Sequence, residues 1–178
     1  RIGRVKRNRG NTSKSQAQQG GPDCPTCLMA DLLRNLPFFG MNSPNPFYGA
    51  EAIYADAGWS FVGAEGDAGK FFILVGKDKG KFVSFKEVAG GGATDAGFGV
   101  ELGRIDISGN PYDFNSNYLF GIRDKVWLSA GEGISAGGAF SWSSFNGISV
   151  YGSSIQIGVG LSPWFVSGGY NHGVIEKK

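Results

Sequence analysis

The chain contains few of the residues on which enzyme and metal chemistry most often depend. Its 178 residues include one histidine, two cysteines and two methionines, and only 18% are charged. A single histidine leaves a hydrolase triad and a histidine-based metal site poorly supported. No run of 18 apolar residues occurs, so the sequence predicts no transmembrane helix.

Glycine, in contrast, is abundant, with 31 of the 178 residues. Average usage is about 7%. The glycines have no three-residue period, which excludes collagen, and an aromatic content of 13% excludes a wholly disordered chain. Glycine destabilises a helix interior by about 1 kcal/mol relative to alanine. We therefore expect a mainly β body.

The first zone, residues 1–22, is predicted to be a basic flexible arm or linker. Residues 1–14 carry six basic side chains and no acidic one, whereas the rest of the chain has 11 basic and 15 acidic residues. A basic arm contacts nucleic acid or anionic lipid through its charge. The body lacks the basic, aromatic sheet face that binds nucleic acid, so the arm alone supports a nucleic-acid partner.

The chain begins at Arg1 rather than methionine, as a processed end would. No charged segment, apolar segment and cleavage site follow one another, so no conventional signal peptide is predicted. We expect secretion, or delivery to another cell, as part of something larger or by another route.

The second zone, residues 23–57, is predicted to be transitional. Cys24 and Cys27 form a CxxC pair that is either a local disulfide or an incidental pair of thiols. Thioredoxin-like redox chemistry lacks its βαβ surroundings, and two thiols cannot complete a four-ligand zinc site. Residues 28–36 predict a short helix with Asp23 as N-cap. Residues 51–58 are either a second short helix or an entry strand.

The third zone, residues 58–178, predicts a Gly-rich antiparallel β domain. About eight short apolar or alternating runs are separated by turn residues, as in a meander that closes as a barrel or sandwich. The sequence KDKG at 77–80 is the clearest hairpin signal. The predicted strands are Trp59–Ala64, Lys70–Lys77, Lys81–Ala89, Gly97–Ile107, Lys125–Ala130, Ile134–Ser143, Ile148–Leu161 and Trp164–Tyr170.

Within the runs, an apolar face alternates with a face of small or polar residues. Along residues 97–103 and 155–161, bulky apolar side chains occupy one face and mostly glycines the other. In a soluble barrel or sandwich the apolar face points inward, whereas in a membrane barrel it meets lipid. The apolar phase changes after Arg104, which predicts a bulge or corner.

Candidate catalytic residues are few. Any histidine-based mechanism must use His172, for example in a nuclease-type site with Arg104. Glu101 lies between Gly99 and Gly103, where a carboxylate is accessible to a ligand or to a pore. No phosphate-binding loop or calcium loop is present. We therefore expect no metal or cofactor, and favour a non-enzymatic role.

The longest interruption of the strand pattern, residues 108–124, is a candidate ligand or partner loop. Loops of this length in a compact domain often carry function. The same sequence is equally consistent with a crossing connection between two halves of a sheet. Its candidate contact residues are Tyr112, Asp113, Phe114 and Tyr118.

The body resembles the Gly-rich C-terminal segments of bacterial RHS/YD-repeat proteins. The resemblance covers about residues 58–173 and depends on runs such as AGGGATDAGFGVELG, SAGEGISAGGAFSW and IQIGVGLSPWFVSGGYNHG. It implies an antiparallel β domain that serves as a toxin-like effector released by self-cleavage, with an RHS-type shell or an immunity protein as partner. The repeat core is absent, and no functional residue carries over.

Three functions follow as expectations. The first is an effector module that acts on membrane lipid, by membrane interaction or pore formation. The second is a non-catalytic barrel or sandwich that binds a ligand or protein partner. The third is a nuclease-type toxin that uses His172.

Overall fold

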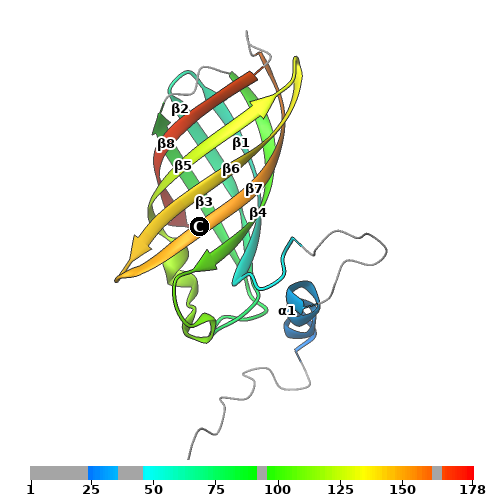
Figure 1. The fold of residues 1–178 in the computed structure, drawn as a ribbon, viewed down its shortest axis with the longest axis vertical. Helices are drawn as coiled ribbons and strands as arrows, with labels where there is room; N and C mark the ends of the chain where they lie inside the picture. Colours follow the sequence, from blue (N-terminus) through cyan, green and yellow to red (C-terminus); the bar gives the residue numbers. More distant parts are fainter. Residues whose placement is uncertain (1–23, 36–45, 92–95, 162–165) are drawn as a thin grey trace, which may run out of the picture.

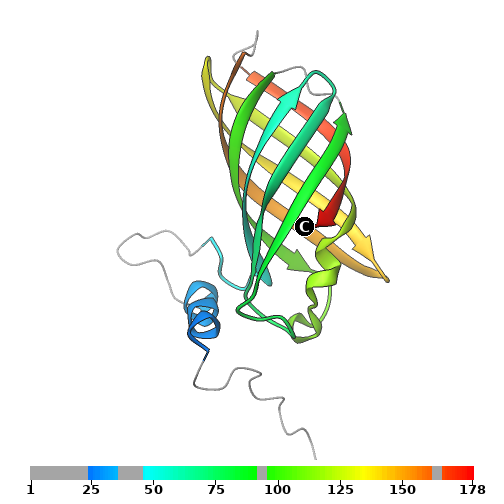
Figure 2. The ribbon, with the colours of Figure 1, turned by 180° about the vertical axis from the view of Figure 1, so that it is seen from behind.

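A computed structural model describes residues 24–35, 46–91, 96–161 and 166–178. It shows a mainly β protein in which eight antiparallel strands close into a barrel (Figures 1 and 2). The predicted fold class is confirmed, and the sheet closes as a barrel rather than a sandwich. The predicted basic arm at 1–22 and the predicted N-cap Asp23 lie outside the described residues.

The elements follow one another in a simple order. One helix precedes the strands, and two 3-10 turns join β4 to β5. They are α1 (Pro25–Asn35), β1 (Ala52–Phe61), β2 (Ala64–Ile73), β3 (Phe82–Gly91), β4 (Ala96–Ile107), η1 (Pro111–Asp113), η2 (Ser116–Leu119), β5 (Gly121–Ala130), β6 (Ile134–Phe145), β7 (Ile148–Leu161) and β8 (Val166–Lys177).

The strand order around the barrel differs from a simple up-and-down meander. It runs β1-β2-β3-β8-β5-β6-β7-β4, and β4 pairs with β1 to close the barrel. Strand β8 thus lies between β3 and β5. We call the end with the turns at 62–63 and 131–133 the upper end, as drawn in Figure 1. The start of β1 and the end of β8 both lie at the lower end.

Several strand boundaries differ from the predictions. Strand β5 begins at Gly121 rather than Lys125, so residues 121–124 of the predicted loop belong to a strand, and β8 extends to Lys177 rather than ending at Tyr170. Residues 51–58 form most of β1, so the entry-strand alternative is correct there. The predicted strand Trp59–Ala64 is wrong, because a turn at 62–63 separates β1 from β2, with Gly63 at a φ of 81°. Residues 65–69, predicted to be a connection, instead lie within β2. The hairpin predicted at 77–80 is confirmed between β2 and β3.

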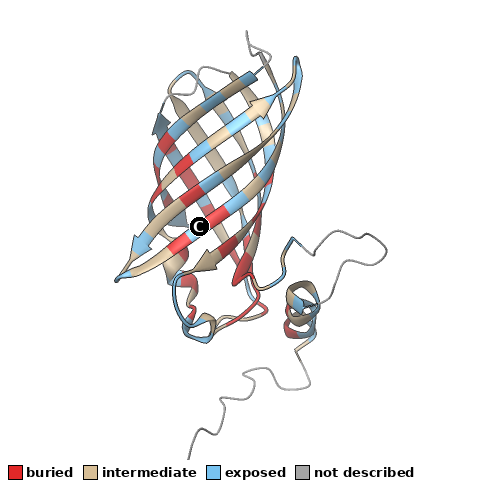
Figure 3. Cartoon of the chain, in the orientation of Figure 1, coloured by how far each residue is buried: buried red, intermediate tan, exposed pale blue. Residues whose placement is uncertain are grey.

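The change of phase at Arg104 marks no bulge. Strand β4 pairs with β7 without interruption from Ala96 to Ile107. Its inward positions change in kind along the strand, from Gly97, Gly99 and Glu101 to Ile105. The pattern inverts because the barrel interior holds charged residues above and the apolar core below. Figure 3 shows buried and exposed residues along the strands.

The lower end of the barrel is closed by an apolar core. Phe71 and Phe85 are fully buried and stack with ring centroids 4.3 Å apart. Phe114, from the connection between β4 and β5, is also fully buried and packs into this cluster. Burying such side chains stabilises the fold by about 1.5–3 kcal/mol each. The other buried members of the cluster are Ala52, Tyr54, Ile73, Val75, Val83, Ile105, Leu119, Val150 and Ile175.

The β2–β3 loop ties this core to the segments around it. Asp78 accepts hydrogen bonds from the hydroxyl and the backbone N–H of Ser116 and pairs with Lys81 at 2.9 Å. The Ser116 bonds, followed by that of Lys81, lower the pKa of Asp78 to about 2.

Glu51, which precedes β1, is also buried at this end. Burial raises the pKa of Glu51, although its carboxylate accepts a hydrogen bond from the Ile107 N–H.

Helix α1 lies at the lower end, outside the barrel (Figure 1). Its Ala30 is fully buried against the barrel residues Phe72 and Leu74, and Asp31 binds the Lys79 ammonium at 2.7 Å. Cys24 and Cys27 form a disulfide, which agrees with one of the two predicted alternatives. Among the described residues, no helix has the length and apolarity needed to cross a membrane.

Candidate functional site

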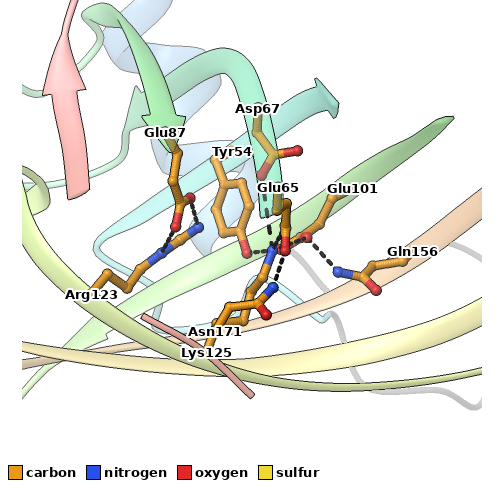
Figure 4. A network of polar contacts seen from close by, with 9 residues as sticks. All are labelled: Tyr54, Glu65, Asp67, Glu87, Glu101, Arg123, Lys125, Gln156 and Asn171. Carbon is orange, nitrogen blue, oxygen red and sulfur yellow. Dashed lines mark hydrogen bonds and ion pairs between the residues drawn. The ribbon is translucent and has the colours of Figure 1, made fainter. Parts of the chain in front are cut away.

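Polar residues of the barrel interior form a network that joins several strands (Figure 4). Lys125, only 2% exposed, points inward from β5 and binds Glu65 of β2. Its ammonium also lies 3.6 Å from Glu101 and 4.0 Å from Asp67. Glu65 accepts a further hydrogen bond from Asn171 of β8. Three strands therefore contribute to one cluster of charges, and β8 adds the amide of Asn171.

Glu101 is held by three neighbours rather than standing free among glycines. The Tyr54 hydroxyl donates to it at 2.5 Å, and the Gln156 amide donates at 2.6 Å, in addition to the nearby Lys125. Gly103 makes this possible, since a Cβ there would overlap the Tyr54 ring. The predicted accessible carboxylate therefore does face the lumen, but as part of a hydrogen-bonded network.

A second ion pair lies nearer the apolar core. The guanidinium of Arg123 contacts both carboxylate oxygens of Glu87, with Nε 3.2 Å from Oε1. Both side chains are at most 5% exposed. Pairing offsets part of the unfavourable desolvation that burial imposes on both charges. Arg123 and Lys125 occupy alternate positions of β5, so both point into the lumen.

The inward charges of the described residues do not balance. Five carboxylates face two basic side chains, an excess of three negative charges when all are ionised. The carboxylates belong to Asp56, Glu65, Asp67, Glu87 and Glu101, and the basic side chains to Arg123 and Lys125. In the described part of the chain, no group of three or more His, Cys, Asp or Glu is arranged to hold a metal ion.

Above this network the lumen contains a cavity of about 140 Å³. Its wall combines the carboxylates with glycines, serine hydroxyls and aromatic residues, of which Trp127 points inward. Lining residues on the inward face include Asp56, Asp67, Glu101, Trp127, Ser129 and Gln156. Because the apolar core fills the interior below, the cavity lies between that core and the upper end.

The outward face of the upper half is apolar. On β4, Phe98 and Val100 are 75% and 55% exposed, and on β7, Ile157 and Val159 are 55% and 63% exposed. We call this surface the apolar belt. Its larger members are Trp59, Phe61, Val88, Phe98, Val100, Leu102, Val126, Leu128, Ile134, Phe140, Ile155, Ile157, Val159, Val166 and Tyr170.

Paired charges mark the lower boundary of the belt. Lys86 pairs with Glu176 at 2.7 Å, Arg104 pairs with Asp106, and Asp124 binds His172 at 2.8 Å. We call these six residues the charged collar. They face outward on β3, β8, β4 and β5.

Aromatic side chains lie beside the collar, where Trp142 is the strand partner of Asp124 and Tyr151 that of Asp106. Trp142 packs near Tyr170 and Phe140, with ring centroids 6.3 and 6.0 Å apart, and Phe140 stacks near Tyr151. The Tyr170 hydroxyl also donates to Asp124 at 2.5 Å. Tyrosine and tryptophan at the edge of an apolar band are typical of membrane–water interfaces.

The structure does not bring the predicted catalytic candidates together. His172 and Arg104 face outward on β8 and β4, which are not neighbours in the barrel, whereas Glu101 faces the lumen. His172 is 57% exposed and binds Asp124, and Arg104 binds Asp106 and the Pro46 carbonyl.

The predicted ligand loop mainly closes the lower end. Phe114 is fully buried, and Tyr118 is partly buried 6.1 Å from the Phe114 ring and 5.4 Å from the Phe145 ring. Tyr112 is exposed, and Asp113 ends η1 next to it. The alternative interpretation, a crossing connection between distant strands, describes its place between β4 and β5.

Several lumen residues were missed by sequence reasoning. Asp56, Glu65 and Asp67 lay in segments interpreted as transitional or as a turn. Arg123 and Lys125 carry a partial signal, because they share one face of the strand, and the other face holds the apolar Ile122 and Val126 but also Asp124. A strand with charges on one face and bulky apolar residues on the other is the pattern of a barrel with a polar interior.

Comparison of the chain with protein-family models, curated proteins and solved structures finds no match.

Proposed function

We propose that the barrel acts by inserting its upper half into a lipid bilayer. The observation that carries the proposal is an inverted arrangement of the upper half. Seven of the eight strands turn bulky apolar side chains outward there, and the inward positions are mostly charged, polar or glycine. Soluble proteins rarely expose contiguous apolar patches beyond a few hundred Å². A belt on most strands around a barrel is therefore best matched by lipid chains.

The height of the belt supports this partner. The belt covers about seven residues of a strand, such as Ala96–Leu102 of β4. At a rise of about 3.3 Å per residue and a tilt of about 40°, it is about 18 Å tall. Transmembrane β-barrels have apolar bands of about 25 Å. Local thinning of the bilayer compensates for a mismatch of this size.

The lower half suits an aqueous environment. It carries the charged collar, helix α1 and both the entry to β1 and the exit from β8. Insertion from this side requires only the upper end to move into the bilayer. Because the apolar core fills the lower interior, the proposed activity is insertion and disturbance of the bilayer, and conduction through the lumen would require that core to open.

The resemblance to RHS-repeat C-terminal segments extends this proposal to a biological setting. There the module would be a toxin-like effector that acts on a target membrane. The belt supports this role above a nuclease. The candidate His172 lies on β8, which is not a neighbour of β4, and on β4 Arg104 faces outward whereas Glu101 faces the lumen.

A flotation experiment with liposomes tests insertion. Ile157→Lys places a charge on the belt, which costs about 2–4 kcal/mol near the bilayer midplane, so we expect flotation and dye release to fall by more than tenfold. Ser144→Lys is the matched control, because Ser144 is exposed and faces outward on β6 below the belt. Flotation of the Ile157 variant equal to that of the control, or failure of the unmodified chain to float, would refute the proposal.

A further inference from the structure

The cavity of the upper lumen has the properties of a binding site. Its volume of about 140 Å³ is close to that of an engineered cavity, about 150 Å³, that binds benzene. Most ligand pockets combine a concave wall with a few convergent polar groups. Here the convergent groups are carboxylates, because Asp56, Asp67 and Glu101 all line the cavity.

One of these carboxylates has no partner within the described part of the chain. Asp56 is 9% exposed, and none of the described residues gives its side chain a hydrogen bond or an ion pair. Glu101 and Asp67, in contrast, lie near Lys125. The absence of a side chain at Gly69 leaves room for Asp56. A Cβ added to Gly69 would lie 2.5 Å from the Cβ of Asp56. A buried, unpaired carboxylate beside an open cavity is suited to a cationic ligand.

An aromatic side chain completes the wall. Trp127 points inward from β5 and lines the cavity, and its ring lies over Gly169, with Nε1 3.0 Å from the position a Cβ would take. The faces of tryptophan rings attract organic cations within about 6 Å, and quaternary ammonium ions are recognised in this way. The carboxylates of the lumen outnumber its basic side chains by five to two, which favours the same class of ligand.

We propose that the upper lumen binds a small organic cation of the ammonium class, with Asp56 as its counter-ion and Trp127 as its aromatic wall. The binding goes beyond the proposed membrane insertion and does not depend on it. Lys125 positions the neighbouring carboxylates, because its ammonium neutralises Glu65 and leaves Asp56 to the ligand.

Calorimetric titration of the full chain with choline tests the proposal. The neutral compound 3,3-dimethylbutan-1-ol has the same shape as choline without the charge and serves as the control probe. Both are titrated at constant ionic strength in a maltoside detergent, which has no choline headgroup that would compete. We expect saturable binding of choline and none of the neutral compound. Equal binding of both compounds, or no saturable binding of choline, overturns the proposal.

Variants locate the site. Asp56→Asn should weaken choline binding by at least about tenfold, and Trp127→Leu by about fivefold. Asp106→Asn, in the charged collar, should leave it unchanged. Circular dichroism verifies that each variant folds. If Asp56→Asn does not fold, the choline affinity of Trp127→Leu alone decides the test. Choline binding that is unchanged in the folded variants overturns the assignment. Liposome flotation of the same samples tests membrane insertion independently, so a failure of choline binding and a failure of insertion can be told apart.

Discussion

The buried ammonium of Lys125 offers the sharpest test of the polar interior. In Lys125→Met the side chain keeps most of its volume but loses its charge. Glu65 then loses its ion-pair partner, and Glu101 and Asp67 lose a cation within 4.0 Å. Removing one partner from a buried ionic group typically costs about 3–5 kcal/mol. Whole domains are stable by about 5–15 kcal/mol, so this one change should remove a large fraction of the stability.

An exposed ion pair provides the matched control. Lys86 pairs with Glu176 at 2.7 Å, but their side chains are 55% and 58% exposed. Pairs of this kind contribute about 0.2–1 kcal/mol because water and salt screen them. Lys86→Met should therefore lower the free energy of unfolding by less than about 1 kcal/mol. The two variants change the same residue type in the same way and differ in burial.

Guanidinium unfolding in detergent micelles, followed by tryptophan fluorescence and circular dichroism, measures both variants. A shift of the midpoint at constant slope reports the change in stability. Combining Lys125→Met with Glu65→Gln should recover part of the loss, because the second change removes an unpaired charge. A loss for Lys125→Met within about 1 kcal/mol of the control would refute a dry, charge-paired interior.

Two further predictions concern the lower end and the packing of glycine. Asp78→Asn should cost about 1–2 kcal/mol at pH 7 by weakening the bonds to Ser116 and Lys81. The pKa of Asp78 is lowered to about 2. Its contribution to stability is therefore complete above the unfolded pKa near 4 and disappears as the pH falls from about 4 through 2. If the difference in unfolding free energy between the variant and the unmodified chain stays constant over this pH range, the assignment is wrong. Gly103→Ala should cost about 2–4 kcal/mol in thermal or denaturant unfolding, since the new Cβ displaces the Tyr54 ring from Glu101. Gly90→Ala, whose Cβ would meet nothing closer than 3.8 Å, should be nearly neutral, and equal losses for the two would disprove the steric argument.

Local patterns in the sequence predict much of the fold. The hairpin at 77–80 follows from turn residues between two apolar runs, and the glycine content excludes a helical body. The alternation along 97–103 correctly separates two faces of β4. The turn at 62–63 was missed because Val62 is apolar and only Gly63 carries the turn conformation. Residues 65–69 resemble a turn because they combine glycines with acidic residues, although they lie within β2 and turn Glu65 and Asp67 toward the lumen.

The candidate site was less predictable, because it is built from strands distant in sequence. Lys125 meets Glu65 and Glu101 only when β5, β2 and β4 curve around one lumen. No local pattern encodes which carboxylate pairs with which base. His172 drew attention as the sole histidine, but its partner is Asp124 on the outer surface.

The sequence by itself determined a glycine-rich antiparallel β domain with two chemically distinct faces, because side chains alternate along a strand whatever the strand packs against. Only the tertiary structure decided which face is inside. Closure into a narrow barrel leaves the lower interior to bulky apolar residues and the upper interior to paired charges and glycine. The inversion at Arg104 thus reflects a change of surroundings along a continuous strand, and it leaves the belt of the upper half facing outward, as a lipid-contacting surface would require.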